Sequence, residues 1–220
     1  MSESKIEIVN RAVRKVARRS KNRLNFLSDS YGWEKWFQVE LAYELSSQGD
    51  ALTEAQRAFD GRKKLPAKKV NNSNAFIDVL FRKKNDLKGK YAAIEIKLIR
   101  TEQGLRHVLQ DLIKIRGLLS SAWNFRSVIV VFVHGVKDGR RDGKFLKVKS
   151  DICAHEKVKP IKTEHFEFLV FGWEPTRDTT VKMAHETYDT WLKDIKAIFQ
   201  DKKIESATLT KRVAKKVNDA

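Results

Sequence analysis

Two apolar segments of the chain contain ionisable residues at positions where a buried strand would carry hydrophobic ones. Asp78 lies within FIDVLF at 76–81, and Glu95 and Lys97 lie within AAIEIKLI at 92–99. Side chains alternate between the two faces of a strand, so Glu95 and Lys97 share one face. If the two segments form a hairpin, Asp78 can meet Glu95 across the pair. Two carboxylates that close repel each other and raise each other's pKa, and a cation usually stabilises them.

These three side chains suit one kind of chemistry. A site with oxygen ligands alone favours Mg²⁺, with Mn²⁺ as the alternative. Lys97, on the same face, could orient a water molecule or stabilise charge that develops on a phosphate. Taken alone, a Glu-x-Lys sequence is more often a solvent-facing ion pair, so the metal interpretation depends on the whole arrangement.

The surrounding pattern predicts the elements that would position these residues. Hydrophobic periodicity predicts helices over 5–27, 33–47, 102–120 and 180–199, and strands over 76–83, 91–99, 127–133 and 166–173. The turn formers at 84–89 join the first two strands, and 62–70 is a candidate edge strand. A short helical turn is expected within 50–60, and 134–164 reads as mostly loop. A helix after the second strand permits a parallel crossover. The chain is therefore predicted to be α/β, with a mixed central sheet flanked by helices.

Over about residues 33–133, the order of elements and the charged residues resemble the PD-(D/E)XK nuclease superfamily, which has the restriction-endonuclease-like fold. Asp78 matches the single Asp of that motif, and Glu95-Ile96-Lys97 matches its (D/E)-x-K, although Ile77 stands where the motif has Pro. The resemblance implies an α-β-β-β-α-β core with basic helical extensions at both ends.

Three domain segments follow from this interpretation. They are a basic N-terminal helical extension at 1–30, a nuclease-like domain at 31–200 and a basic C-terminal tail at 201–220.

The resemblance also implies an activity. The chain is expected to be a Mg²⁺-dependent DNA endonuclease, in which Asp78 and Glu95 bind the metal and Lys97 activates or orients the attacking water. A homodimer is consistent with this family. Two alternatives stay open: a catalytically inactive nucleic-acid-binding protein on a nuclease-like scaffold, and a nuclease directed at RNA.

Members of this family usually add a carboxylate from the first helix. WEKWFQVELAYEL offers Glu34, Glu40 and Glu44, all of which border the apolar face of the helix. Glu40 is the predicted catalytic and metal-binding residue because Gln-Val-Glu-Leu resembles the family's signature best, with Glu34 second. In the second helix, the polar residues that could face the site are Gln103, Arg106, His107 and Gln110.

The charge of the chain is one-sided. Lys and Arg number 45 against 28 Asp and Glu, which gives a formal net charge of +17. Such a balance favours a polyanionic partner, with nucleic acid ahead of an anionic membrane surface. The predicted nucleic-acid contacts are Arg62, Lys63, Lys64, Lys68, Lys69, Arg140, Arg141 and Lys144.

Several other classes of protein are not expected. Cys153 is the single cysteine, so no intrachain disulfide can form, which suits a reducing, cytoplasmic environment. The longest apolar run, VIVVFV, is far shorter than the roughly 20 residues of a membrane span. The sequence also lacks a P-loop, zinc-finger spacing and a G-x-S-x-G motif.

Overall fold

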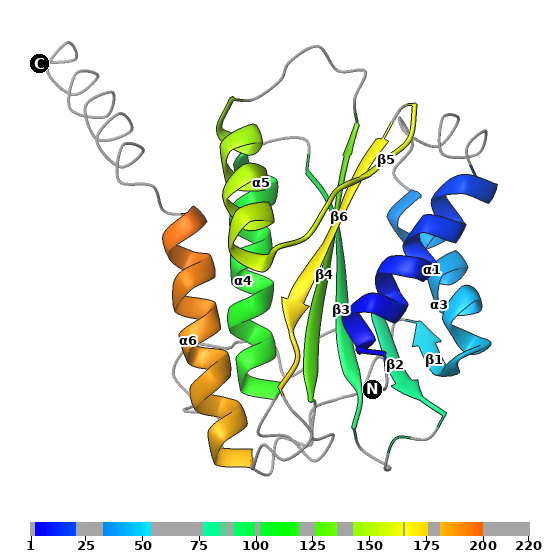
Figure 1. The fold of residues 1–220 in the computed structure, drawn as a ribbon, viewed down its shortest axis with the longest axis horizontal. Helices are drawn as coiled ribbons and strands as arrows, with labels where there is room; N and C mark the ends of the chain where they lie inside the picture. The colour runs from blue at the N-terminus through cyan, green and yellow to red at the C-terminus, as the bar shows by residue number, and fades with distance from the viewer. Residues whose placement is uncertain are drawn as a thin grey trace, which may run out of the picture.

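A computed structural model describes residues 3–20, 33–53, 77–84, 86, 90–99, 102–118, 126–135, 143–164, 166–175 and 181–199. In chain order the elements are α1 (Lys5–Arg19), α3 (Trp33–Ser46), β1 (Gly49–Thr53), β2 (Val79–Lys83), β3 (Ala92–Leu98), α4 (Glu102–Leu118), β4 (Ser127–Gly135), α5 (Gly143–Glu156), β5 (Ile161–Lys162), β6 (Phe166–Trp173) and α6 (Val181–Phe199). The fold is mixed α/β, which confirms the predicted class (Figure 1).

The described strands form one mixed sheet in the order β1-β2-β3-β4-β6-β5. The pairs β1–β2 and β2–β3 are antiparallel, so the predicted hairpin of β2 and β3 is confirmed. β3 and β4 are parallel, and α4 makes the crossover between them. The remaining pairs, β4–β6 and β6–β5, are antiparallel.

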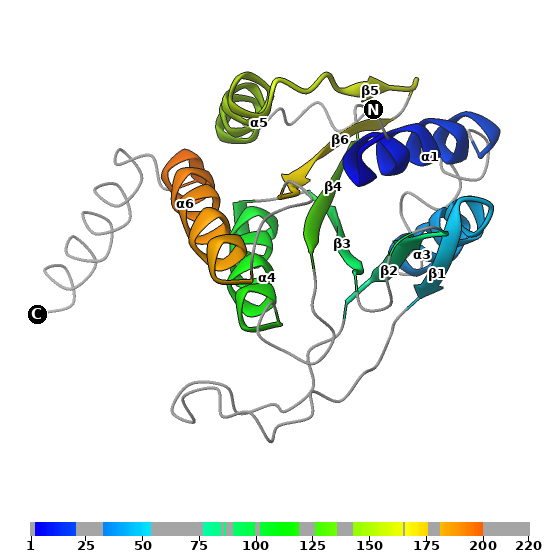
Figure 2. The ribbon, with the colours of Figure 1, turned by 60° about the horizontal axis from the view of Figure 1, so that its bottom comes forward.

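Helices cover both faces of this sheet. α1 and α3 lie on one face, and α4, α5 and α6 lie on the other (Figures 1 and 2). β4 is buried on both sides: Val128 and Val130 pack in the α4–α6 layer, whereas Ile129 and Val131 pack in the α1–α3 layer. Each fully buried aliphatic side chain of this kind contributes about 1.5–3 kcal/mol to stability, so the sheet is a rigid support for polar groups placed on it.

α1 belongs to the same hydrophobic layer as α3. It begins at a capping box, in which the Ser4 side chain accepts from the Glu7 backbone and the Glu7 side chain accepts from the Ser4 backbone. Val9, Val13 and Val16 are fully buried in the α1–α3 layer.

The predicted tail at 201–220 lies outside the described residues.

Two segments differ from the sequence-based prediction. The expected helical turn within 50–60 is wrong at its start, because Gly49–Thr53 pairs with β2 as a strand. A side chain at Gly49 would overlap the carbonyl oxygen of Arg82, so only glycine permits this close pairing. The predicted edge strand at 62–70 lies outside the described residues.

The second difference is the segment expected to be loop, in which α5 occupies Gly143–Glu156 and the short strand β5 pairs with β6. Val148 and Ile152, four residues apart, are buried in the α4–α6 layer, so tertiary packing stabilises a helix in a strongly basic sequence. Lys157, the first residue after the helix, has a left-handed backbone conformation with a φ of 53°. The backbone N–H of Val158 donates to the Cys153 carbonyl, which completes a helix end without the glycine that would signal it in the sequence.

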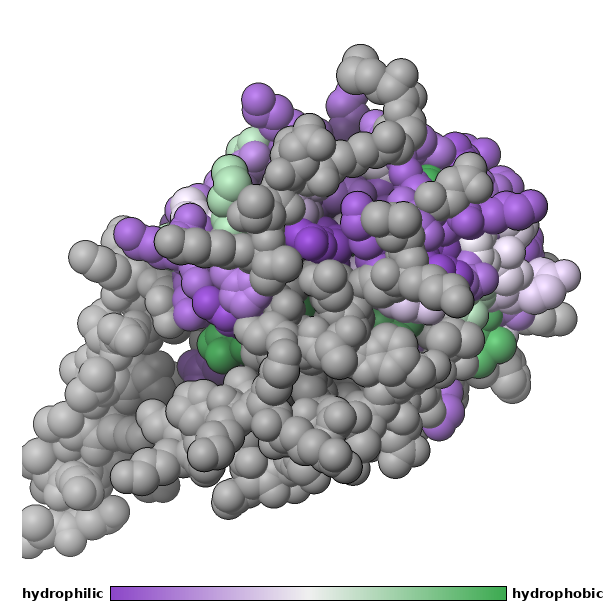
Figure 3. Space-filling model, turned by 90° about the horizontal axis from the view of Figure 1, so that it is seen from below, coloured by the Kyte–Doolittle hydropathy of each residue, from purple (hydrophilic) through white to green (hydrophobic). Residues whose placement is uncertain are grey.

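Among the helices that the structure describes, none is long and apolar enough to cross a membrane. Seen from below, the described part of the surface is mostly hydrophilic, with only small hydrophobic areas between the polar ones (Figure 3).

Candidate active site

Asp78 and Glu95 meet on the sheet face that α4 covers. The register of β2 and β3 ends with Val79 opposite Ile94, which leaves Asp78 beside Glu95. Leu80 and Ala93, two residues away on either strand, pack in the α4–α6 layer, so both carboxyl groups point to that face. The two side chains therefore lie side by side on one sheet face, where the negative charge of Asp78 acts on Glu95.

Burial makes this pair of acids unfavourable in the charged state. Glu95 is only 3% exposed, and burial raises its pKa well above the usual value, with further increases from the charges of Asp78 and Asp111. Burial also raises the pKa of Asp78, although the hydrogen bond from the Ile96 backbone acts in the opposite direction. Glu95 is therefore no part of an ordinary solvent-facing ion pair, which was the simpler interpretation of the Glu-x-Lys sequence.

Lys97 lies on the same face as Glu95 and is held by a carboxylate from α4. Its Nζ lies 2.9 Å from Oδ2 of Asp111 and 4.0 Å from Oε2 of Glu95. Burial is the largest single influence and lowers the pKa of Lys97, but the hydrogen bond and charge of Asp111, together with the charges of Glu95 and Asp78, raise the pKa overall. In this arrangement Lys97 is a stable cation and not a proton acceptor.

Carboxylates also satisfy the free edge of β3 beyond its pairing with β2. The backbone N–H of Ile96 donates to Oδ2 of Asp78 at 2.7 Å, and that of Leu98 donates to Oε1 of Glu34 at 3.0 Å. Buried backbone donors need such partners, so both acids have a structural role whatever else they do. Through this contact the carboxylate of Glu34, on α3, reaches the edge of β3 near Asp78. The negative charge of Glu34 helps to raise the pKa of Asp78.

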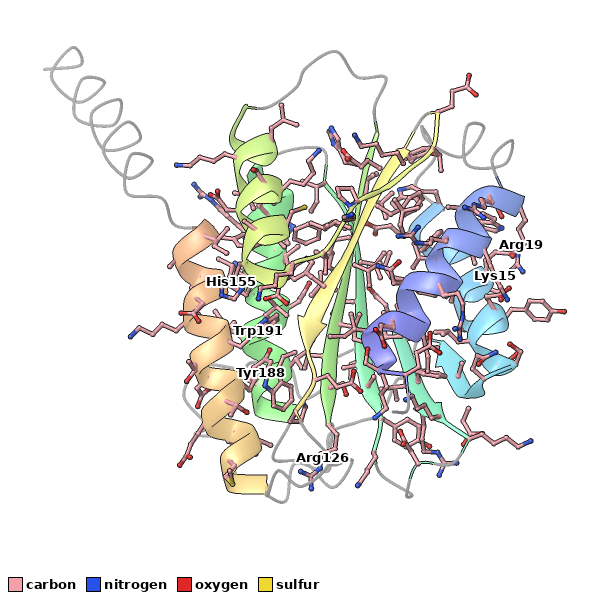
Figure 4. The ribbon with its side chains drawn as sticks, in the orientation of Figure 1. Lys15, Arg19, Arg126, His155, Tyr188 and Trp191 are labelled. Atoms are coloured by element: carbon pink, nitrogen blue, oxygen red, sulfur yellow. The ribbon has the colours of Figure 1, made fainter. Side chains whose placement is uncertain are left out.

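The first-helix carboxylate at the site is therefore Glu34, the second choice from the sequence. Glu40, the first choice, forms an ion pair with Arg19 of α1 at 2.8 Å, and Glu44 pairs with Arg19 and Lys15 (Figure 4). Six residues of helix turn a side chain by roughly 240°, so Glu34 and Glu40 cannot both face β3. We replace Glu40 by Glu34 in the candidate site.

Asp111 was not among the residues selected from the second helix. Of those that were, Arg106, His107 and Gln110 are exposed, and the side chain of Gln103 lies outside the described part. Asp111 follows Val108 by three residues and precedes Ile115 by four, both of which are buried. A carboxylate among the buried positions of this helix is unusual, and this feature of the sequence could have identified Asp111 as a candidate site residue.

Gln38, one helical turn after Glu34, is a further polar residue in the buried stripe of α3. It is 7% exposed, and its Oε1 has no hydrogen-bond partner among the residues that the structure describes. An unsatisfied buried acceptor costs about 1–3 kcal/mol, so this position is not optimised for stability.

Most of the predicted nucleic-acid contacts cannot be placed. Arg62, Lys63, Lys64, Lys68, Lys69, Arg140 and Arg141 lie outside the described residues, and Lys144 lies in α5 with its side chain outside the described part. Within α1, Lys15 and Arg19 pair with carboxylates of α3, which offsets part of the positive charge of that helix.

The carboxylates of Asp78 and Glu95 suit a cation that prefers oxygen ligands and takes only one or two of them from the protein. The described residues contain no group of three or more His, Cys, Asp or Glu side chains arranged to hold a metal. Asp78 and Glu95 nevertheless provide two neighbouring carboxylates on one face. Mg²⁺ is typically bound by one or two carboxylates, with water and substrate phosphates as its other ligands. The pair therefore fits Mg²⁺ better than a metal that needs a full protein cage.

No family model matches the chain, and no curated protein and no solved structure matches it. The resemblance to the PD-(D/E)XK superfamily stays a prediction from the motif. The assignment of the site therefore depends on the geometry of Asp78, Glu95, Lys97, Glu34 and Asp111.

Proposed function

We propose that the chain is a metal-dependent DNA endonuclease of the PD-(D/E)XK type. The observation that supports this most strongly is the placement of Asp78 and Glu95 side by side on one sheet face, with the ammonium group of Lys97 on the same face. A buried pair of acids whose pKa values are both raised is expected where a cation or a proton offsets the charge.

Each residue has a distinct role in this proposal. Asp78 and Glu95 would hold Mg²⁺, or Mn²⁺ in its place. When bound, the ion would supply positive charge for the scissile phosphate and make water more acidic. Lys97, as a stable cation, would orient the attacking water by hydrogen bonding and stabilise negative charge on the phosphate, rather than remove a proton. Glu34 fixes the end of β3 through Leu98 and completes the acidic edge.

The order of elements is consistent with this proposal. α3, β1, β2, β3, α4 and β4 follow one another in the order α-β-β-β-α-β that the motif implies. The net charge of +17 supports a nucleic-acid substrate, since phosphate contacts by Lys and Arg dominate affinity for DNA and RNA.

Cleavage of supercoiled plasmid tests the proposal. The wild-type protein should nick plasmid in Mg²⁺ or Mn²⁺ and not in EDTA, and Lys97→Met should lower the rate about 100- to 1,000-fold. Lys149→Met is the matched control, because Lys149 of α5 is also a partly buried lysine and pairs with Glu167 of β6 at 2.6 Å, away from β2 and β3. Absence of metal-dependent cleavage on plasmid, linear duplex, branched DNA and RNA would remove this proposal. Cleavage of RNA but not DNA would mean that the chain is a nuclease directed at RNA.

One observation favours a second candidate, a nucleic-acid-binding protein without catalysis. The ammonium group of Lys97 is already paired with the carboxylate of Asp111 at 2.9 Å, which offsets the positive charge that catalysis would use. This candidate predicts salt-sensitive DNA binding that Lys97→Met and Glu95→Gln leave unchanged, with no cleavage in any metal.

A further inference from the structure

We propose that Asp111 is a positioning residue that holds Lys97 away from the Asp78–Glu95 pair, so that these two carboxylates stay available to a divalent cation. This inference rests on the proposed metal-dependent function and assigns a role to a residue that the motif does not contain.

The distances define which acid holds the lysine. Nζ of Lys97 lies 2.9 Å from Asp111 but 4.0 Å from Glu95, at the limit of an ion pair. All three side chains are largely shielded, with exposed fractions of 26% for Lys97, 18% for Asp111 and 4% for Glu95. The lysine is therefore bound to the helix above the sheet rather than to its neighbour on the strand.

The position of Asp111 does not depend on Lys97. α4 is fixed against the sheet by Val108 and Leu112, which are buried in the α4–α6 layer. The hydroxyl of Tyr188 on α6 also donates to the carbonyl of Leu112 at 2.9 Å, directly after Asp111 (Figure 4). A packed helix therefore presents the carboxylate at a set height above β3.

Lysine is the mobile partner in this arrangement. Its ammonium group is carried on a flexible four-carbon stem, so without Asp111 it could turn to the nearest remaining carboxylates. These are Glu95 and Asp78, which an ammonium group would neutralise in competition with a metal ion. The structure thus provides one carboxylate for the lysine and two for a cation.

Two other roles of Asp111 make different predictions. It could contact the cation itself, or it could serve only the stability of the fold, as an ordinary ion pair does. The pair of Lys149 and Glu167 illustrates the second case, since it joins α5 to β6.

Binding of Mn²⁺ without DNA, measured by electron paramagnetic resonance of the free ion, separates these roles. The proteins compared are wild type, Asp111→Asn, Lys97→Met and the double variant. Asp111→Asn should weaken Mn²⁺ binding about 10- to 100-fold when Lys97 is present, and should have little effect in the Lys97→Met background. Asp111→Glu should restore part of the binding. Urea unfolding of each protein verifies that the variants are folded.

Asp194→Asn is the control for a lost negative charge, because Asp194 is a half-exposed carboxylate of α6 beside His155. It should leave Mn²⁺ binding unchanged. Equal weakening by Asp111→Asn in both backgrounds would mean that Asp111 acts on the cation directly, and no weakening in either would mean that the ion pair is structural. Both results overturn the inference.

The binding assay distinguishes this inference from the proposed function. If wild type binds Mn²⁺ with the expected dependence on Asp111 but cleaves no DNA, the endonuclease proposal fails and the positioning role stands. If wild type cleaves DNA and Asp111→Asn binds Mn²⁺ normally, the positioning role fails alone.

Discussion

Asp78 and Glu95 lie side by side across the β2–β3 pair, on the sheet face that α4 covers, and burial raises the pKa of both. One proton or one cation satisfies this arrangement, whereas two bare carboxylates do not. The two acids are therefore a source of instability in the metal-free protein at neutral pH.

The first prediction concerns stability and pH. Glu95 has a folded-state pKa well above 4.5, so the folded protein binds more protons than the unfolded chain above pH 4.5. The free energy of unfolding should then fall as pH rises from 4.5 to the folded-state pKa, and level off above it. Glu95→Gln should remove this slope and be more stable than wild type at pH 8 by an amount of order 1 kcal/mol or more. Urea unfolding in EDTA across pH 4.5–9 measures this, and a wild-type profile that rises over that range contradicts it.

The second prediction concerns metal and stability. Mg²⁺ that binds only the folded state should stabilise wild type by about 3 kcal/mol at a hundredfold excess over its dissociation constant. The combined Asp78→Asn and Glu95→Gln variant should show no such gain. Melting temperatures with Mg²⁺ and with EDTA provide the measurement, and an equal rise in both proteins would place the ion elsewhere.

The third prediction separates the first-helix acids. Glu34→Gln should lower the rate of DNA cleavage about 10- to 100-fold, because its carboxylate bonds to Leu98 next to the site. Glu40→Gln should keep most of the activity, since Glu40 pairs with Arg19 at 2.8 Å on the opposite side of α3. Single-turnover cleavage rates of the two variants test whether Glu34 or Glu40 belongs to the site. A larger loss of rate in Glu40→Gln than in Glu34→Gln would support Glu40, the residue predicted from the sequence.

The fourth prediction concerns Gln38. Replacement by Met removes an acceptor that has no partner, and so should raise the free energy of unfolding by about 1 kcal/mol. Gln48→Met, at an exposed position after α3, serves as the control and should have little effect. A clear loss of stability in Gln38→Met would show that the amide has a partner in solution, and a loss of cleavage with gained stability would assign it to the site.

The parts of the fold that depend on the hydrophobic pattern of a single short segment could be predicted from the sequence. The alternation in AAIEIKLI put Glu95 and Lys97 on one face, and the short turn after FIDVLFRK made a hairpin that brings Asp78 to Glu95. The uninterrupted apolar run that became β4 identified a strand buried on both faces.

The remaining features depend on packing between distant elements. The buried stripe of α4 could have identified Asp111 as a candidate, but which turn of α4 lies over Lys97 is set by the fit of the helix on the sheet, so the Asp111–Lys97 pair could not be found from spacing alone. The choice between Glu34 and Glu40 depended on the position of α1, whose Arg19 binds Glu40. α5 was missed because its basic composition resembles a loop, although Val148 and Ile152 provide a buried side.

We propose that Asp78, Glu95 and Lys97 together form a metal-dependent nuclease site. The most direct test is the initial rate of plasmid nicking as a function of Mg²⁺ concentration for wild type, the combined Asp78→Asn and Glu95→Gln variant, and Lys149→Met. We expect Mg²⁺-dependent nicking by wild type and Lys149→Met, and none above background by the double variant. Equal nicking by all three proteins, or none by wild type in either Mg²⁺ or Mn²⁺, would contradict it.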